Sequence, residues 1–180
     1  LHEDASGRLW VGLRGGLGWM DGMVFRPFRD RDGPVKEQVL AITVDGDKTL
    51  WAATTRGVMS FRDGVRKVYG TRDGLMNPIS HTLVMDAAGH IWAATNDGLF
   101  VWNGERFAAR YFANGSMRTV HFDDEGTIWI GMGGGGLHWV REGKQYHVGS
   151  REGLASDTIM GFADDGRGHF WMTSPAGVFR

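Results

Sequence analysis

The sequence predicts an all-β fold, and three features support this expectation. Short stretches rich in apolar and β-branched residues recur along the chain, as at residues 41–44 and 82–85. Turn-forming residues separate these stretches, and the 180 residues include 29 glycines, where the usual share is about 7%. A tryptophan recurs at nearly constant intervals, at positions 10, 51, 92, 129 and 171. Together these features indicate short strands, joined by tight turns, in a repeated unit.

The repeated unit has a period near 41 residues. Successive tryptophans are separated by 41, 41, 37 and 42 residues. An aspartate stands six residues before each of them and a glycine six residues after. The repeated residues are Trp10, Trp51, Trp92, Trp129 and Trp171, with Asp4, Asp45, Asp86, Asp123 and Asp165, and with Gly16, Gly57, Gly98, Gly135 and Gly177. A period of about 40 to 50 residues is typical of a solenoid, an array or a β-propeller.

Each period is expected to contain four strands. The first is the apolar, β-branched stretch, as at residues 41–44. An aspartate followed three residues later by a glycine, as at Asp86 and Gly89, then favours a type I turn into the tryptophan-bearing second strand. A third strand opens near the next glycine, as at Gly57, and a pair such as the Asp-Gly at 63–64 favours a hairpin into a fourth. Four antiparallel strands in this length are the content of one propeller blade.

The predicted architecture is therefore a β-propeller fragment with four-stranded antiparallel blades of about 41 residues. Dividing the 180 residues by the period gives roughly four and a half blades. The expected propeller segment covers residues 1–180, with a partial blade at 1–33, blades at about 34–74, 75–115 and 116–153, and a partial blade at 154–180. We expect the chain to be a piece of a larger ring.

Composition and charge exclude several classes of protein. A net charge of -1 offers no basic surface for nucleic acid. No apolar run approaches the roughly 20 residues of a membrane helix, so we expect no membrane contact within this segment. The absence of cysteine excludes disulfides, thiolate metal sites and a cysteine nucleophile.

Sequence motifs for catalysis are weak. Residues 131–136 contain GxGxxG, but a strand is expected at 137–140, where a dinucleotide site needs a helix N-terminus. We interpret these glycines as a flexible connection that something can approach closely. The acidic stretches at 30–33 and 123–126 are interpreted as turns rather than calcium loops. The seven histidines lack HxxxH and HExxH spacing, so we expect no catalytic residue, no metal and no cofactor.

The phrase Asp-x-x-Gly-x-[Leu/Ile]-Trp-x-x-Thr-x-x-Gly-Leu, which residues 86–99 match at every named position, resembles the two-component regulator propeller repeat. The resemblance covers nearly the whole chain, with departures such as Lys48 at a turn-glycine position. It implies a ligand-sensing propeller on the periplasmic or extracellular face of a membrane-anchored parent. It also implies that the parent carries a histidine kinase or a diguanylate cyclase outside this segment.

The repeated residues are interpreted as structural. A tryptophan that recurs once per blade is better explained by packing between adjacent blades than by stacking on a ligand. The repeated aspartate is expected to accept backbone N–H groups in its own turn. The predicted anchors are Trp10, Trp51, Trp92, Trp129, Trp171, Asp45, Asp86, Asp123, Gly57 and Gly98.

The candidate ligand-binding residues are those that break the repeat on the loops. Loops between second and third strands, and loops between blades, share one face of a propeller, and rigid scaffolds carry function on such loops. Guanidinium and amide groups there suit a small-molecule or carbohydrate-like ligand. The candidates are Arg14, Arg56, Asn77, His81, Asn96 and Arg118. The loop before Arg118 is four residues shorter than its counterparts, which predicts a notch between Arg118 and His81.

Three functions remain open from the sequence, and the sensor is favoured. The second is a propeller enzyme of the antibiotic-linearising lyase type, which the repeat distantly resembles; that resemblance implies a catalytic histidine beside a metal-holding Glu or Gln. His81 and His121 are the candidates for that histidine. The third is a protein-interaction scaffold, for example a homodimer. The remaining blades of the parent ring are an expected partner in each case.

Overall fold

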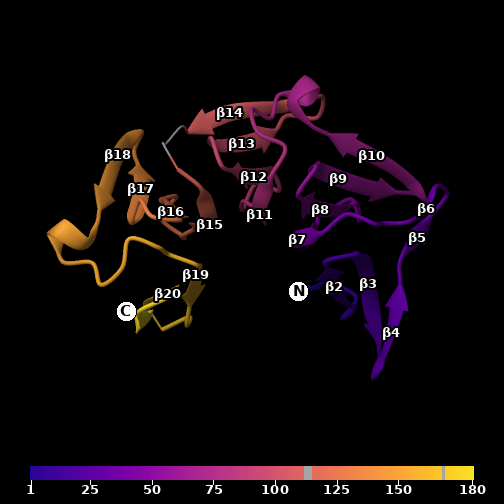
Figure 1. Ribbon diagram of the computed structural model, residues 1–180, viewed down its shortest axis with the longest axis horizontal. Coiled ribbons are helices and arrows are strands. Elements are labelled where there is room, and N and C mark those ends of the chain that lie inside the picture. The colour runs from indigo at the N-terminus through magenta and orange to yellow at the C-terminus, as the bar shows by residue number, and fades with distance from the viewer. Residues whose placement is uncertain (112–114, 168) are drawn as a thin grey trace.

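Almost all regular structure in the protein is β-strand. The computed structural model describes residues 1–111, 115–167 and 169–180. Five antiparallel sheets stand side by side along an arc that is open on one side (Figure 1). This arrangement confirms the predicted all-β propeller fold with four-stranded blades.

The strands follow chain order across each sheet, which we call blades 1 to 5. Blade 1 contains β1 (His2–Glu3), β2 (Leu9–Leu13), β3 (Gly16–Asp21) and β4 (Val24–Pro27). Blade 2 contains β7 (Val39–Val44), β8 (Leu50–Thr54), β9 (Gly57–Arg62) and β10 (Val65–Tyr69). Blade 3 contains β11 (Ser80–Met85), β12 (Ile91–Thr95), β13 (Leu99–Trp102) and β14 (Phe107–Tyr111). Blade 4 contains β15 (Met117–Phe122), β16 (Ile128–Met132), β17 (Leu137–Arg141) and β18 (Lys144–Val148). Blade 5 contains β19 (Gly161–Asp164), β20 (Phe170–Ser174) and β21 (Gly177–Phe179).

The first strand of each complete blade lies toward the centre of the arc and the fourth lies at its periphery (Figure 1). Blade 1 has four strands, of which β1 has only two residues, and blade 5 has three strands among the described residues. Two short 3-10 helices, Thr71–Asp73 and Ser150–Glu152, lead out of blades 2 and 4. Residues 34–40 contain no helix.

A carboxylate clasp closes the first turn of every blade. In blade 3, Asp86 Oδ1 accepts hydrogen bonds from the backbone N–H groups of Ala88 and His90, at 3.0 and 2.9 Å. Asp86 Oδ2 accepts one from the indole Nε1 of Trp92, at 2.8 Å. The aspartate-to-indole bond recurs in all five blades, at 2.8 to 2.9 Å in blades 1 to 4 and 3.4 Å in blade 5. The aspartate and the tryptophan six residues later therefore act as one unit.

The last residue of this turn needs a left-handed backbone. Gly89 and Gly126 have φ of 85° and 81°. Lys48 occupies the same position in blade 2 and has φ of 62°. A side chain in this region costs about 1–2 kcal/mol. The departure from glycine therefore leaves the turn intact at an energetic cost.

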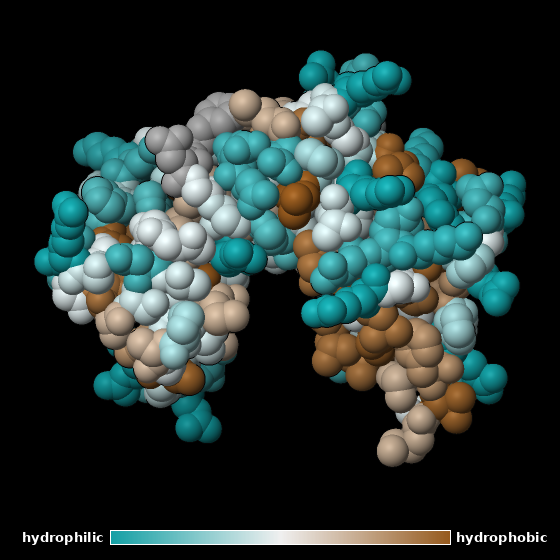
Figure 2. Space-filling view, in the orientation of Figure 1, coloured by the Kyte–Doolittle hydropathy of each residue, from teal (hydrophilic) through white to brown (hydrophobic). Residues whose placement is uncertain are grey.

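The hydrophobic core lies between adjacent blades rather than within one sheet. One cluster joins Trp10 and Leu17 of blade 1 to Ile42 and Met59 of blade 2. A second cluster joins blades 2 and 3, and its largest members are Trp51, Tyr69, Phe100 and Phe107. A third cluster joins blades 3 and 4, and its largest members are Tyr111, Met117, Ile130 and Met132. Blade 1 leaves hydrophobic residues exposed at the end of the arc, as the brown colour there shows (Figure 2).

An additional hairpin joins blades 1 and 2 where the sequence predicts only a loop. It consists of β5 (Arg29–Asp30) and β6 (Gly33–Pro34). The carboxylate of Asp30 is fully buried and binds the guanidinium of Arg66 at 2.7 and 3.0 Å. Arg66 also donates to the carbonyl of Gly33 at 3.1 Å. The acidic stretch at 30–33 thus anchors the hairpin to the outer strand of blade 2.

Candidate functional site

Antiparallel strand order divides the connections between two faces of the arc. Turns from first to second and from third to fourth strands lie on one face, which we call the turn face. Connections from second to third strands and from blade to blade lie on the opposite, loop face. All six predicted ligand-binding residues lie in loop-face connections or at strand ends beside them.

The structure brings two of these six residues together. His81, at the start of β11, places Nε2 2.7 Å from Oδ1 of Asn96 in the loop after β12. Asn77 uses its side-chain oxygen to accept the N–H of Ile79 at 2.9 Å. Arg14, Arg56 and Arg118 are exposed. Ligand binding by this set stays a prediction.

The glycine run between β16 and β17 is held by the chain itself. Gly133 N–H donates to the carbonyl of Ser116 at 2.7 Å. The N–H groups of Gly134 and Gly136 donate to the carbonyl of Asp157 at 3.0 and 2.7 Å. The expectation of a flexible connection open to close approach is therefore wrong, because neighbouring loops of the protein already occupy these backbone donors.

The predicted notch involves the loop that precedes Arg118. Residues 112–114 of that loop lie outside the described residues. Arg118 itself lies over Gly133, since a Cβ built on this glycine would come within 2.8 Å of Arg118 Nε. The notch between Arg118 and His81 stays a prediction.

A histidine links blades 3 and 4 near this glycine run. His138 Nε2 lies 3.0 Å from the carbonyl of Gly135, and Nδ1 lies 2.8 Å from the hydroxyl of Tyr111. Only an N–H can bind the carbonyl, so Nε2 carries the proton and Nδ1 accepts the Tyr111 O–H. Burial lowers the pKa of His138, and nearby His147 lowers it further, against the opposing effect of the Gly135 bond. No sequence motif indicated this contact.

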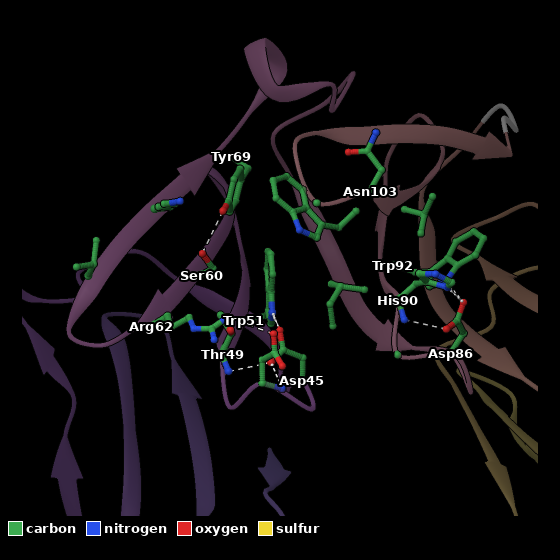
Figure 3. Close-up of a pocket in the computed structure, with 18 of the residues that line it drawn as sticks. Asp45, Thr49, Trp51, Ser60, Arg62, Tyr69, Asp86, His90, Trp92 and Asn103 are labelled. Atoms are coloured by element: carbon green, nitrogen blue, oxygen red, sulfur yellow. Dashed lines mark hydrogen bonds and ion pairs between the residues drawn. The ribbon is translucent and has the colours of Figure 1, made fainter.

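A broad hollow of about 1110 Å³ opens on the turn face between blades 2 and 3 (Figure 3). Its aromatic wall includes Trp51 and Tyr69, whose ring centroids lie 5.7 Å apart, and Trp102, 4.6 Å from Tyr69. The hydroxyls of Ser60 and Tyr69 lie 3.2 Å apart within it. The predicted ligand-binding residues do not line this hollow. The hollow lies on the face opposite these residues, and no sequence motif indicated it.

Several charged side chains form the rim of the hollow. Arg62 pairs with Asp47 at 3.2 Å and contacts Asp63 at 4.0 Å. Asp45 and Asp86 are engaged by their own turns and by the indoles of Trp51 and Trp92. The exposed cations Lys67 and Arg110 also line the hollow.

The candidate histidines of the lyase hypothesis have other neighbours. His81 contacts Asn96, and the ring of His121 lies 5.2 Å from that of Phe170. Within the described residues, no three His, Asp or Glu side chains are close enough together to share a metal ion. The described part of the chain also has no helix with the length and apolar character needed to cross a membrane.

Comparison with known proteins gives a match in structure only. No family model matches the chain, and no curated protein sequence matches it. The extracellular domain of BT4673 from B. thetaiotaomicron, described as a one-component system, matches with a TM-score of 0.75 and 17% identity. This match covers 98% of the chain and 26% of that domain.

A catalytically inactive virginiamycin B lyase from Staphylococcus aureus, solved with quinupristin, matches with a TM-score of 0.76 and 12% identity. This match covers 98% of the chain and 62% of the lyase. The chain thus spans about a quarter of the first protein and less than two thirds of the second. At these identities the similarity shows a shared fold, and that fold is the β-propeller that the repeat resemblance implies.

Proposed function

We propose that the chain is a segment of a ligand-sensing propeller on the periplasmic or extracellular side of a membrane-anchored signalling protein. The output of that protein is a histidine kinase or a diguanylate cyclase. The observation that carries the proposal is the repeat phrase at 86–99, whose aspartate and tryptophan form the same clasp in every blade. The fold similarity to the extracellular domain of BT4673 supports it.

In this proposal the segment binds and transmits rather than catalyses. Loop-face residues hold a small-molecule or carbohydrate-like ligand, with His81 and Asn96 already in contact. The remaining blades of the parent ring cover the exposed hydrophobic end of blade 1. A homodimer or another protein partner on that surface is the corresponding scaffold alternative.

The test uses the full-length parent protein. We expect its sequence to contain a membrane-spanning helix followed by a kinase or cyclase domain, and its output to change when ligand is added. The double substitution His81→Ala and Asn96→Ala is expected to weaken that response at least tenfold. Glu105→Ala, an exposed change on the turn face, serves as the matched control. A parent without a membrane helix and an output domain would contradict the proposal.

The lyase alternative rests on the fold similarity to virginiamycin B lyase. Metal analysis of the purified protein separates it from the sensor. A stoichiometric divalent ion, lost on substitution of His81 or His121, would favour the enzyme.

A further inference from the structure

His138 breaks the repeat at a position where blades 2 and 3 have apolar side chains. On the third strand, it lies opposite the residue that follows the repeated tryptophan. Met59 has this place in blade 2 and Phe100 has it in blade 3. Met59 is 2% exposed and Phe100 is fully buried. Blade 4 therefore places a half-buried ionisable ring where its neighbours have core residues.

Both ring nitrogens of His138 are engaged in a way that only the neutral ring allows. Nε2 donates to the carbonyl of Gly135 at 3.0 Å, and Nδ1 accepts from the hydroxyl of Tyr111 at 2.8 Å. A proton on Nδ1 would turn this acceptor into a donor and leave the Tyr111 O–H without an acceptor. Tyr111 is 5% exposed, and a buried donor without an acceptor is unfavourable. The charged ring therefore does not fit this contact.

The surroundings of His138 offer nothing to offset a positive charge. The titratable and charged groups on the strands that flank it are Tyr111, Arg110, His147 and Lys144. His147 lies directly opposite on β18, with the two ring centroids 5.6 Å apart. Lys144 lies at the far end of β18, and Arg110 lines the hollow on the other side of blade 3. Among the described residues, no carboxylate acts on His138.

The glycine run at 133–136 connects His138 to two inner loops of the loop face. The carbonyl of Gly135 binds the ring, while N–H groups of the run donate to the carbonyls of Ser116 and Asp157 at 2.7 to 3.0 Å. Ser116 directly precedes the first strand of blade 4, and Asp157 lies in the connection to the first strand of blade 5. Release of His138 would therefore loosen the run that joins these two connections.

We propose that the contact of His138 with Tyr111 and Gly135 is a pH-sensitive switch of the loop face. The neutral ring holds the glycine run against blade 3. Protonation releases both contacts, so the run separates from its neighbours in mildly acidic solution while the blades stay folded. The proposal rests on the geometry between blades 3 and 4 and does not depend on a ligand or on the signalling role of the parent.

The test is amide hydrogen exchange of the wild-type protein, followed by NMR at pH 7.5 and pH 5.5. Protection factors corrected for the intrinsic pH dependence of exchange should fall at least tenfold at pH 5.5 for the amides of Gly133, Gly134 and Gly136. The amide of Thr95, which donates to Gly98 in the equivalent connection of blade 3, should change less than twofold. The amides of β12 should do the same. An equal fall at all of these amides would indicate global unfolding and would overturn the switch.

Two variants assign the effect to one ring. His138→Phe introduces the apolar ring that blade 3 has at this position and should abolish the pH dependence of the glycine amides. His147→Gln is the matched control: it should keep the pH dependence and move it to higher pH, because it removes a neighbouring imidazole. Circular dichroism at pH 7.5 checks that both variants keep the wild-type fold. Undiminished pH dependence in the His138→Phe variant, or its loss in the His147→Gln variant, overturns the proposal.

Discussion

A single carboxylate in each blade holds both a turn and the core tryptophan. Burial by itself would raise the pKa of Asp86, but the hydrogen bonds from Trp92 and His90 outweigh it and leave the pKa below its ordinary value. Asp123 shows the same balance, with Trp129 and Thr127 as donors. These aspartates are therefore charged at neutral pH, and the charge strengthens each bond that they accept.

We expect Asp86→Ala to lower the free energy of unfolding by about 2–4 kcal/mol, because it leaves the Trp92 indole and two turn N–H groups without their acceptor. Urea unfolding measures this change. Asp165→Ala is the matched variant in blade 5, where the indole bond is longer at 3.4 Å and the carboxylate is more exposed. Its cost should be smaller, and an equal cost would argue against the clasp.

The contact between His138 and Tyr111 predicts a pH dependence. The folded-state pKa of His138 lies below its ordinary value, mainly through burial. The unfolded chain therefore binds a proton more readily near pH 6, so stability is fully present above about pH 6.5 and falls as the pH drops toward the folded-state pKa. Urea midpoints from pH 8 to pH 5 measure this. His138→Gln should flatten the profile, and an unchanged slope would exclude His138 as its source.

At the scale of the strand, packing between blades depends on matched pairs of side chains. Gly12 on β2 faces Val39 on β7, and a Cβ at Gly12 would lie 2.7 Å from a Val39 methyl. Gly131 on β16 faces Ile159, and a Cβ there would lie 2.7 Å from an Ile159 methyl. In both cases a β-branched side chain packs directly against a glycine of the preceding blade. The strand position that is alanine in blades 2 and 3 is glycine in blades 1 and 4 for this reason.

We expect Gly12→Ala to cost about 1–3 kcal/mol of unfolding free energy, because the added methyl overpacks the contact with Val39. Val39→Ala alone should cost a similar amount through the cavity that it leaves. The double variant should cost less than the sum of the two, since each change relieves the other. Thermal or urea unfolding of the four proteins measures the coupling, and strict additivity would contradict the pairing.

At the scale of the whole molecule, each blade packs one face of its sheet on the blade before it. Leu50 and Ile91, which precede the repeated tryptophan in blades 2 and 3, are 4% and 2% exposed. Leu9 has the same repeat position in blade 1 and is 36% exposed, with Leu13 at 45%. Blade 1 therefore exposes the apolar residues that blades 2 and 3 bury against the blade before them.

Substitution at this repeat position should cost much more stability in blade 2 than in blade 1. Leu50→Thr is expected to cost about 2–4 kcal/mol, because it removes buried apolar contact between blades 1 and 2. Leu9→Thr combined with Leu13→Thr should change the unfolding free energy by less than about 1 kcal/mol and should reduce self-association. Urea unfolding and analytical ultracentrifugation measure the two quantities. A large loss of stability in the blade 1 variant would show that its surface is already covered.

Contacts on the two faces of the arc were harder to predict than the blades. Ser60 and Val101 break a pattern that Trp19 and Trp139 follow, but the pattern appears only when strand register shows which third-strand residue lies opposite each tryptophan. Arg110 reaches the hollow through a bulge, which shifts register in a way that sequence spacing does not reveal. The sequence did indicate that His81 and Asn96 lie on one face, because both follow from their place in the repeat.

The sequence by itself determined the blade, because aspartate, glycine and tryptophan at constant intervals specify turns and strands through local hydrogen bonds and backbone preferences. It also determined that blades repeat around an arc. Only the tertiary structure decided which groups meet between blades. Examples are the ion pair of Asp30 with Arg66, the hydrogen bonds from the glycine run to Ser116 and Asp157, and the hollow between blades 2 and 3. These contacts join residues far apart in the chain, and their distances depend on how neighbouring sheets pack together.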